Sequence, residues 1–284
     1  MRRFTITLFA AIALAVAPSA ASAQDQATPE PGPILTKLGH TPMVELWDGG
    51  GGLPFLGATQ SYNAGDWENA LRKYHADGVY EKQIGKVDAV AARWITRAGR
   101  RGGHHRFKLH RRGAHKRGVK VVKAARHGKR GHGHGKRKPA IVFDVDETAL
   151  SNYTAIDADN FTFGPQSQAE AVNEIGTAIK PSLALYKLAQ QKGIATFFIT
   201  GRRENVRDHT ASNLQREGFT DYTELVLKPD DFTGSTVAYK SGARAAIEQQ
   251  GYRIVANVGD QYSDLAGGHS AAAFKLPNPF YYLP

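Results

Sequence analysis

Residues 139–284 predict a doubly wound α/β fold, in which a parallel sheet carries helices on both faces. Short runs of apolar and β-branched residues alternate there with segments of helical period. The first two runs are separated by a long connection, so the strands that they form should be parallel. With 41% hydrophobic and 10% aromatic residues among 284, the chain can bury a globular core.

Five strands are expected in this region. They are the run that begins at Ile141 and residues 194–199, 224–227, 253–258 and 272–276. Polar residues 151–180, between the first two strands, match no core element and should form a small cap.

Three helices are expected between these strands. The first begins at Pro181 and ends before Gly193, because proline is favoured in the first helical turn and glycine just past the last. The second has Val206 and Leu214 on one face, and the third spans residues 239–250. Strand and helix therefore alternate to the end of the chain.

Two amphipathic helices are expected before this region, within residues 66–97. Trp67 and Trp94 belong to apolar stripes at helical spacing, so we expect both side chains in the core. Residues 24–65 are rich in Pro and Gly and show no sustained period. We expect them to form an irregular lead-in that is ordered only where it packs on the domain.

The amino terminus has the pattern of a cleavable secretory signal peptide. Arg2 and Arg3 precede an apolar stretch that ends at Ala17, and small residues follow up to Ala23. The stretch is shorter than the roughly 18 apolar residues of a membrane span, and no later segment reaches that length. A short membrane anchor is the alternative. We expect residues 1–23 to be removed and the mature protein to be secreted or periplasmic, without a transmembrane segment.

A strongly basic insert precedes the first strand. Residues 97–138 contain 17 of the 37 Lys and Arg, 7 of the 11 His and no Asp or Glu, which leaves 20 basic against 26 acidic residues elsewhere. Apart from Val119, Val121 and Val122 it offers little to bury, so we expect residues 98–138 to be mostly disordered. Three interpretations remain open: a solvated linker, a metal-binding histidine tract, and an electrostatic tether to an anionic polymer, nucleic acid or membrane surface.

The apolar run at 141–150 contains two carboxylates one residue apart. Asp144 and Asp146 leave the carboxyl end of a buried strand together, which is where open α/β sheets bind ligands. Carboxylates this close repel each other, and a bound divalent cation usually offsets that repulsion. A calcium loop of the EF-hand type is the alternative, but its sixth position should be Gly and is Ala149, and its twelfth should be Glu and is Ala155.

Residues 144–148 read D-V-D-E-T and resemble the first motif of the haloacid dehalogenase superfamily, D-x-D-x-T. The other motifs of that superfamily follow in order. They are matched by the hydroxyl of Thr200, the lysine Lys240 and the acidic pair Asp260 and Asp264.

The chain is similar in particular to the acid phosphatase and vegetative storage protein branch of this superfamily, subfamily IIIB. The run Y-H-A-D-G-V-Y at 74–80 and the ending at 275–282 carry this likeness. The resemblance covers about residues 62–97 and 139–284, and the basic insert has no counterpart. It implies a haloacid dehalogenase-like, Rossmann-like sheet with N-terminal helices and a small cap.

The resemblance also implies roles for individual residues. Asp144 would be the nucleophile that forms an aspartyl-phosphate, and Asp146 would act as general acid and then as general base. The residues expected to bind the substrate phosphate are Thr200, Gly201 and Lys240. Lys228 is a rival for the lysine, but the proline that follows it makes a helix start there less natural.

Magnesium is the implied cofactor. Its expected ligands are Asp144, Asp260, Asp264 and the backbone carbonyl of Asp146, because Mg²⁺ prefers oxygen and uses few carboxylates.

These features favour an exported, Mg²⁺-dependent acid phosphatase that acts on small phosphate monoesters. The second aspartate of the first motif is absent from the dehalogenases of the superfamily, so its presence favours phosphate ester hydrolysis. A non-catalytic storage or polyanion-binding protein on the same fold is the alternative. The usual mark of that state is loss of the nucleophilic aspartate, and Asp144 is present.

Overall fold

A computed structural model describes residues 32–47, 64–98, 105–112, 116–123, 137–162 and 164–283 of the chain. The expected signal peptide lies outside these residues. Among the described helices, none combines the length and the apolar character that crossing a membrane requires.

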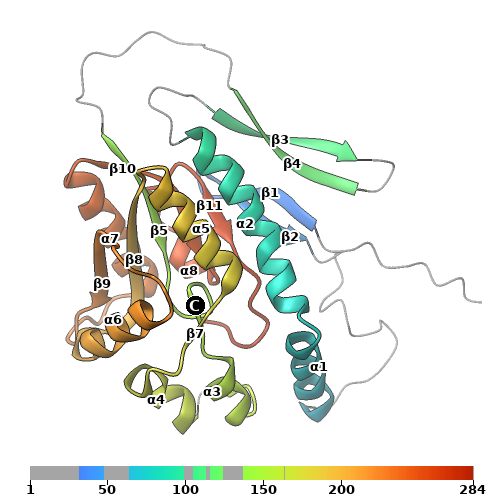
Figure 1. Ribbon diagram of the computed structural model, residues 1–284, viewed down its shortest axis with the longest axis vertical. Coiled ribbons are helices and arrows are strands. Elements are labelled where there is room, and N and C mark those ends of the chain that lie inside the picture. Colours follow the sequence, from blue (N-terminus) through green and yellow to red (C-terminus); the bar gives the residue numbers. More distant parts are fainter. Residues whose placement is uncertain are drawn as a thin grey trace, which may run out of the picture.

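A seven-stranded sheet forms the centre of the molecule (Figure 1), which confirms the predicted α/β class. The strand order is β1-β2-β11-β10-β5-β8-β9, and every neighbouring pair is parallel except β1 and β2. The strands are β1 (Gly32–Leu38), β2 (Thr41–Trp47), β5 (Lys138–Phe143), β8 (Ala195–Arg203), β9 (Glu224–Lys228), β10 (Tyr252–Gly259) and β11 (Ala273–Lys275). The five predicted strands are β5 and β8 to β11.

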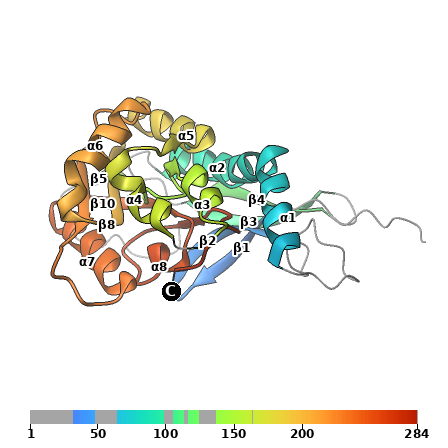
Figure 2. The same ribbon diagram turned by 90° about the horizontal axis from the view of Figure 1, so that it is seen from below.

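Helices cover both faces of this sheet (Figure 2). The helices on one face and its rim are α1 (Ala64–Ala76), α2 (Val79–Ala98), α5 (Lys180–Gln191) and α6 (Arg207–Arg216); those on the other are α7 (Thr236–Gln249) and α8 (Tyr262–Leu265). Strand side chains alternate between the two layers. In β5, Ile141 and Phe143 pack in the core beneath α2 and α5, whereas Ala140 and Val142 pack beneath α7.

The order of the strands determines where a ligand can bind. From β5 the chain proceeds to β8 and β9 on one side, and it then returns to β10 on the other side of β5. Doubly wound sheets bind ligands beyond the carboxyl ends of the strands at such a change of direction. Asp144 directly follows β5 and Asp260 directly follows β10, so this point of the sheet brings them together.

A small cap lies at the carboxyl edge of the sheet. Its elements are β6 (Leu150–Ser151), α3 (Tyr153–Ala158), α4 (Pro165–Asn173) and β7 (Thr177–Ala178), with β6 and β7 paired antiparallel. The side chain of Asn213 in α6 binds both the backbone N–H and the carbonyl of Gly176, at 3.0 and 2.7 Å. This contact anchors the end of the cap to the core domain.

The N-terminal lead-in is more regular than expected. Residues 32–47 form the hairpin β1–β2, and β2 extends the main sheet by pairing with β11. Gly39 has a φ of 60° in the turn, a conformation that glycine adopts without strain. Met43 and Val44 are buried. The prediction of irregular structure is wrong here, because the strand that stabilises this hairpin comes from the far end of the chain.

Part of the basic insert is also ordered, and the prediction of disorder is wrong for that part. Two antiparallel strands form a hairpin, β3 (His105–Arg112) and β4 (Lys116–Lys123). Phe107 and Val121 lie opposite each other and are buried. Phe107 stacks on Trp94 of α2 with ring centres 4.4 Å apart. Apolar and basic residues alternate over a short distance in each strand. This alternation would have predicted the hairpin, but the very basic composition obscured it. Residues 99–104, 113–115 and 124–136 lie outside the described part of the chain.

The two tryptophans of the N-terminal helices differ in burial. Trp94 is 4% exposed, and its indole N–H donates to the carbonyl of Val255 at 2.6 Å. Trp67 is 40% exposed, so the expectation that it belongs to the core is wrong. The reason is the position of α1 at the rim of the domain, where it buries only Leu71 and Tyr74.

Candidate active site

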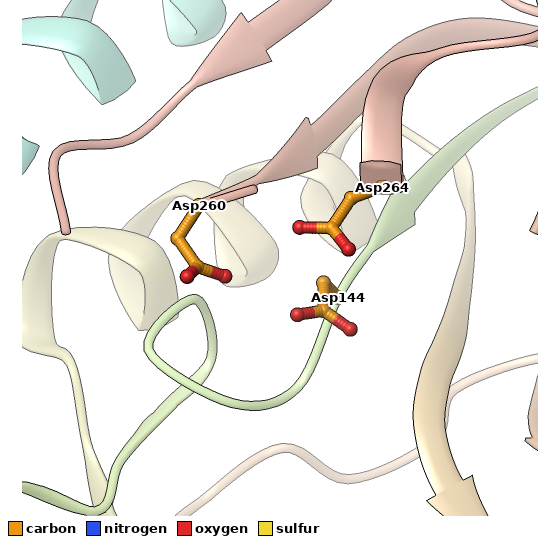
Figure 3. A group of neighbouring side chains, drawn as sticks. All are labelled: Asp144, Asp260 and Asp264. Carbon is orange, nitrogen blue, oxygen red and sulfur yellow. The ribbon is translucent and has the colours of Figure 1, made fainter. Parts of the chain in front are cut away.

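Three buried carboxylates converge between the ends of β5 and β10 (Figure 3). Asp144 follows β5, Asp260 follows β10, and Asp264 belongs to α8. Each offers one oxygen, and the three oxygens lie within 4.8 Å of one another. Oxygen donors of this charge and spacing suit a hard divalent cation.

Lys240 of α7 contacts two of these carboxylates. Its ammonium donates to Oδ1 of Asp144 and to Oδ1 of Asp264, each at 2.6 Å. Burial alone would lower the pKa of Lys240, but the two carboxylates outweigh it and raise that pKa, so the lysine stays charged. The rival Lys228 instead lies over the ring of Phe232, with its ammonium 5.5 Å from the ring centre. The geometry therefore favours Lys240 as the lysine of the site.

One lysine does not balance three buried acids. Burial, and then the neighbouring Asp264, raise the pKa of Asp144 well above its usual range despite Lys240. The same two causes raise the pKa of Asp260 to about 6. A cation would favour the anionic form of both groups. The donor set and its excess negative charge therefore fit the predicted metal site.

Three neighbouring side chains hold the carboxylate of Asp260 in place beside Asp144 and Asp264. One oxygen accepts a hydrogen bond from the hydroxyl of Thr148 at 3.1 Å. The other accepts from the side-chain amides of Gln261 and Asn278, both at 2.7 Å. Neither amide was predicted, and no spacing rule in the sequence links Asn278 to Asp260.

Asp146 lies apart from the three-carboxylate group. Its Oδ1 accepts hydrogen bonds from two nitrogens of Arg202, at 2.6 and 2.9 Å, and from the amide of Asn152 at 2.8 Å. Burial alone would raise the pKa of Asp146, but Arg202 and Asn152 together lower it. Both partners were missed in the sequence, although Arg202 directly follows Thr200-Gly201.

Thr200 and Gly201 lie in the carboxyl-terminal part of β8, near Asp146. The hydroxyl of Thr200 is buried, 3.5 Å from Oδ2 of Asp146, and it accepts from the backbone N–H of Arg202 at 3.1 Å. No helix begins directly at this motif, because β8 continues past it into a 3₁₀ turn, η1 (Glu204–Val206), before α6 begins. The N–H of Arg202 is therefore used internally, whereas Gly201 is exposed.

A buried glutamate connects this site to the N-terminal helices. Glu147 has a left-handed backbone, with φ of 49°, and its side chain accepts hydrogen bonds at 2.6 Å from the Tyr80 hydroxyl and from the backbone N–H of Asn152. Burial raises the pKa of Glu147 to about 8. Because Asn152 also binds Asp146, α2 reaches the site through Tyr80, Glu147 and Asn152.

A family model described as HAD superfamily, subfamily IIIB (Acid phosphatase), matches residues 110–284, more than half of the chain. The chain belongs to this family. The suspected resemblance is thereby confirmed, and the match begins inside the basic insert.

Two relatives show how far the likeness extends. The chain is 40% identical over 148 residues to "Acid phosphatase 1" of Solanum lycopersicum, which is 50% of this chain and 58% of that protein. It is 34% identical over 152 residues to "Vegetative storage protein 1" of Arabidopsis thaliana, 50% of this chain and 55% of that one. The aligned part thus spans little more than half the length of these relatives.

A solved structure with the same fold is the class C acid phosphatase from Bacillus anthracis with tungstate bound. It aligns with a TM-score of 0.54 over 76% of this chain and 86% of its own, at 18% identity. This likeness supports the α/β architecture described above.

Proposed function

We propose that the protein is an exported acid phosphatase that requires Mg²⁺ and hydrolyses small phosphate monoesters through an aspartyl-phosphate. The observation that carries this proposal is the assembly around Asp144, which combines Lys240 at 2.6 Å with two further carboxylates within 4.8 Å. Membership of the acid phosphatase family and the name of the tomato relative support it.

The ligands of Mg²⁺ would be the side chains of Asp144, Asp260 and Asp264 and the backbone carbonyl of Asp146. When bound, the ion would supply the positive charge that lets a carboxylate approach a phosphate dianion.

In the first step, a carboxylate oxygen of Asp144 attacks phosphorus while the bond from phosphorus to the alcohol oxygen breaks. Asp146 donates its proton to the departing oxygen, and it later takes a proton from the water that hydrolyses the acyl phosphate. A phosphate dianion near Asp146 would offset the effect of Arg202 and help this carboxylate to carry the proton. Lys240, the Thr200 hydroxyl and the Gly201 N–H would bind phosphate oxygens as their charge changes.

A non-catalytic storage protein on the same fold is the second candidate, because the Arabidopsis relative carries that name. The arrangement of the site favours catalysis. Asp144 and Lys240 are both present and in contact, and Asp146 lies next to its own cation, Arg202.

A panel of phosphate monoesters, assayed with Mg²⁺ and after exhaustive chelation, tests the proposed function. We expect hydrolysis with Mg²⁺, loss of turnover in EDTA and recovery when Mg²⁺ is added in excess, since the buried carboxylates need a cation to accept a dianionic substrate. Turnover that survives chelation would contradict the metal requirement. Failure to hydrolyse any monoester, in a folded protein with Mg²⁺, would favour the storage candidate.

Replacing Tyr80 by Phe should lower kcat through the loop that holds Asp146. The substitution removes one hydroxyl from Glu147 and should cost about 1 kcal/mol of stability. Tyr74→Phe is the matched control, because its hydroxyl donates at 2.6 Å to Gln83 within the helical layer. Both variants should unfold at similar temperatures, and only Tyr80→Phe should lose kcat. Equal kcat in the two variants would argue against the positioning role.

We also propose that residues 1–23 direct export, so that the mature chain begins near Gln24. N-terminal sequencing of the exported protein tests this, and a retained Met1 would count against it.

We propose further that the basic insert, residues 97–138, tethers the enzyme to a polyanion. The part of the insert that the structure describes supports this. The β3–β4 hairpin lies near one end of the long axis of the molecule, and the cap helices α3 and α4 lie at the other (Figure 1). A polymer bound to the hairpin would leave the catalytic edge open.

A further inference from the structure

The outward face of the β3–β4 hairpin carries a set of exposed cations. Arg106, Lys108 and Lys120 are exposed, whereas Phe107 and Val121 are buried. Side chains alternate across a strand, so one face of the hairpin packs on the protein and the opposite face meets solvent. We call Arg106, Lys108 and Lys120 the cationic ribbon.

The ribbon is built on a supported backbone. Phe107 stacks on Trp94, and the guanidinium of Arg97 donates to the carbonyl of Val121, so α2 holds both strands. Val119 is buried as well. The cations are therefore presented at set positions, unlike charges on a flexible tail.

The ribbon places like charges against each other. Lys108 lies directly opposite Lys120 in the strand register. Directly opposed like charges destabilise a sheet. Residues 97–138 contain no Asp or Glu that could offset them. Within the described ranges, none of the ion pairs involves a residue of the ribbon. An anionic ligand would relieve this repulsion.

A second basic feature lies at the amino ends of the sheet strands. A groove of about 830 Å³ is lined by Arg137, Lys138 and Lys192, with Tyr252 and one acid, Asp221. Arg137 and Lys138 are the last residues of the insert, and Lys138 is the first residue of β5. Because Lys138 begins β5 and Asp144 follows the last residue of that strand, the groove lies at the end of the sheet opposite the three-carboxylate group.

We propose that the cationic ribbon binds a linear phosphodiester chain, which gives the tether proposed above a specific docking surface. Alternate residues of a strand are separated by about 6.7 Å, a spacing similar to that of successive phosphates in an extended polymer. No aromatic side chain is exposed on the described part of this face, so the ribbon contacts the backbone of the polymer and not its bases. Nucleic acids and polyol-phosphate polymers share this chemistry.

A lipid surface fits this face less well. Membrane-surface binding normally combines cations with apolar side chains that enter the headgroup region. The described apolar side chain on the outward face is Val122, which is opposite Arg106 and only half-exposed.

The test compares two triple variants of the full-length protein that lose the same charge. One is Arg106→Gln, Lys108→Gln and Lys120→Gln. The other is Arg126→Gln, Lys129→Gln and Arg130→Gln, in the same insert but outside the described residues. Binding is measured to a single-stranded oligonucleotide, to duplex DNA and to poly(glycerol phosphate) over a range of salt concentrations, with anionic phospholipid vesicles as a further arm. Hydrolysis of a small monoester is measured in parallel.

We expect the ribbon variant to bind single-stranded DNA roughly tenfold or more weakly at low salt, with a slope of log affinity against log salt that is shallower by about 2. The matched variant should lose much less of its affinity for single-stranded DNA. Preference among the three polymers identifies the source of the phosphodiester. Small-monoester hydrolysis should be unchanged in both, because neither variant touches the catalytic groups.

A second variant, Lys108→Glu, keeps the test decisive if the triple variant folds poorly. Glu at this position would pair with Lys120 across the strands, so the hairpin should be retained while polymer affinity falls. Thermal unfolding checks that it is folded. If the two triple variants lost polymer affinity equally, the cationic ribbon would not be the specific docking surface, although the insert as a whole could still act as a tether. Wild-type protein that binds none of the polymers, or binds only vesicles, would overturn both.

Discussion

Replacing Asp144 with Asn should reduce phosphate monoester turnover by roughly 10⁴-fold or more, as expected when the nucleophile of a covalent mechanism is removed. The substitution keeps the shape of the side chain but removes the oxygen anion proposed to attack phosphorus, which is also a proposed ligand of the cation. Initial rates with saturating Mg²⁺ measure the loss. Acid-quenched wild-type protein should retain covalent phosphate during turnover, and the Asn variant should retain none.

Asp88→Asn is the matched control, because Asp88 is a buried carboxylate of α2 that is not part of the three-carboxylate group. The hydroxyl of Ser182 donates to one of its oxygens at 3.1 Å, and the other oxygen is buried without a hydrogen-bond partner. This variant should retain full activity. If it lost as much activity as Asp144→Asn, the loss would reflect a damaged fold and the assignment of the nucleophile would fail.

The control also has an expected pH signature. Burial raises the pKa of Asp88 to about 7. The folded protein then holds a proton that the unfolded chain releases near pH 4, so this group makes stability fall as pH rises from about 4 to 7. Asp88→Asn should remove that fall, and the variant should be more stable than wild type above pH 7.

Replacing Lys240 with Met should impair both stability and catalysis. Lys240 bridges Asp144 and Asp264, and all three groups are buried. Removing one partner of a buried ion pair typically costs about 3–5 kcal/mol, because the remaining charge is left without compensation. Loss of a group that stabilises charge in the transition state typically lowers kcat by about 10²–10³-fold.

Thermal unfolding with and without Mg²⁺ separates these two effects. Bound cation should restore much of the lost stability of Lys240→Met, since it compensates the same carboxylates, but it should not restore kcat. Lys228→Met provides the control, because the ammonium of Lys228 lies over Phe232 instead of between carboxylates. If Lys228→Met were the more damaging variant, the assignment of Lys240 to the site would be wrong.

The local sequence was sufficient for the core of the fold. Apolar runs of strand length alternate with helical periods after residue 139, and each predicted strand there is present. The same pattern put Asp144 and Asp260 after two strands, and motif order added Lys240. The positions of the strands, and of the two aspartates after them, are confirmed. They could be predicted because strand period, helix termini and strand-end position are properties of short segments.

Contacts between distant segments decided the rest. β1 and β2 are ordered because β11 completes their sheet, and β3 and β4 because Trp94 covers Phe107. Composition describes such segments as irregular or disordered, because the surface that buries them lies elsewhere in the chain.

The electrostatic difference between the two aspartates of the motif is also tertiary. Asp144 and Asp146 are one residue apart and identical in chemistry. The first lies among Lys240, Asp260 and Asp264, and the second accepts hydrogen bonds from Arg202 and Asn152. Opposite pKa shifts follow from those surroundings. Sequence supplied the two carboxylates, and the packing of separate strands, loops and helices around them decided their charge environments.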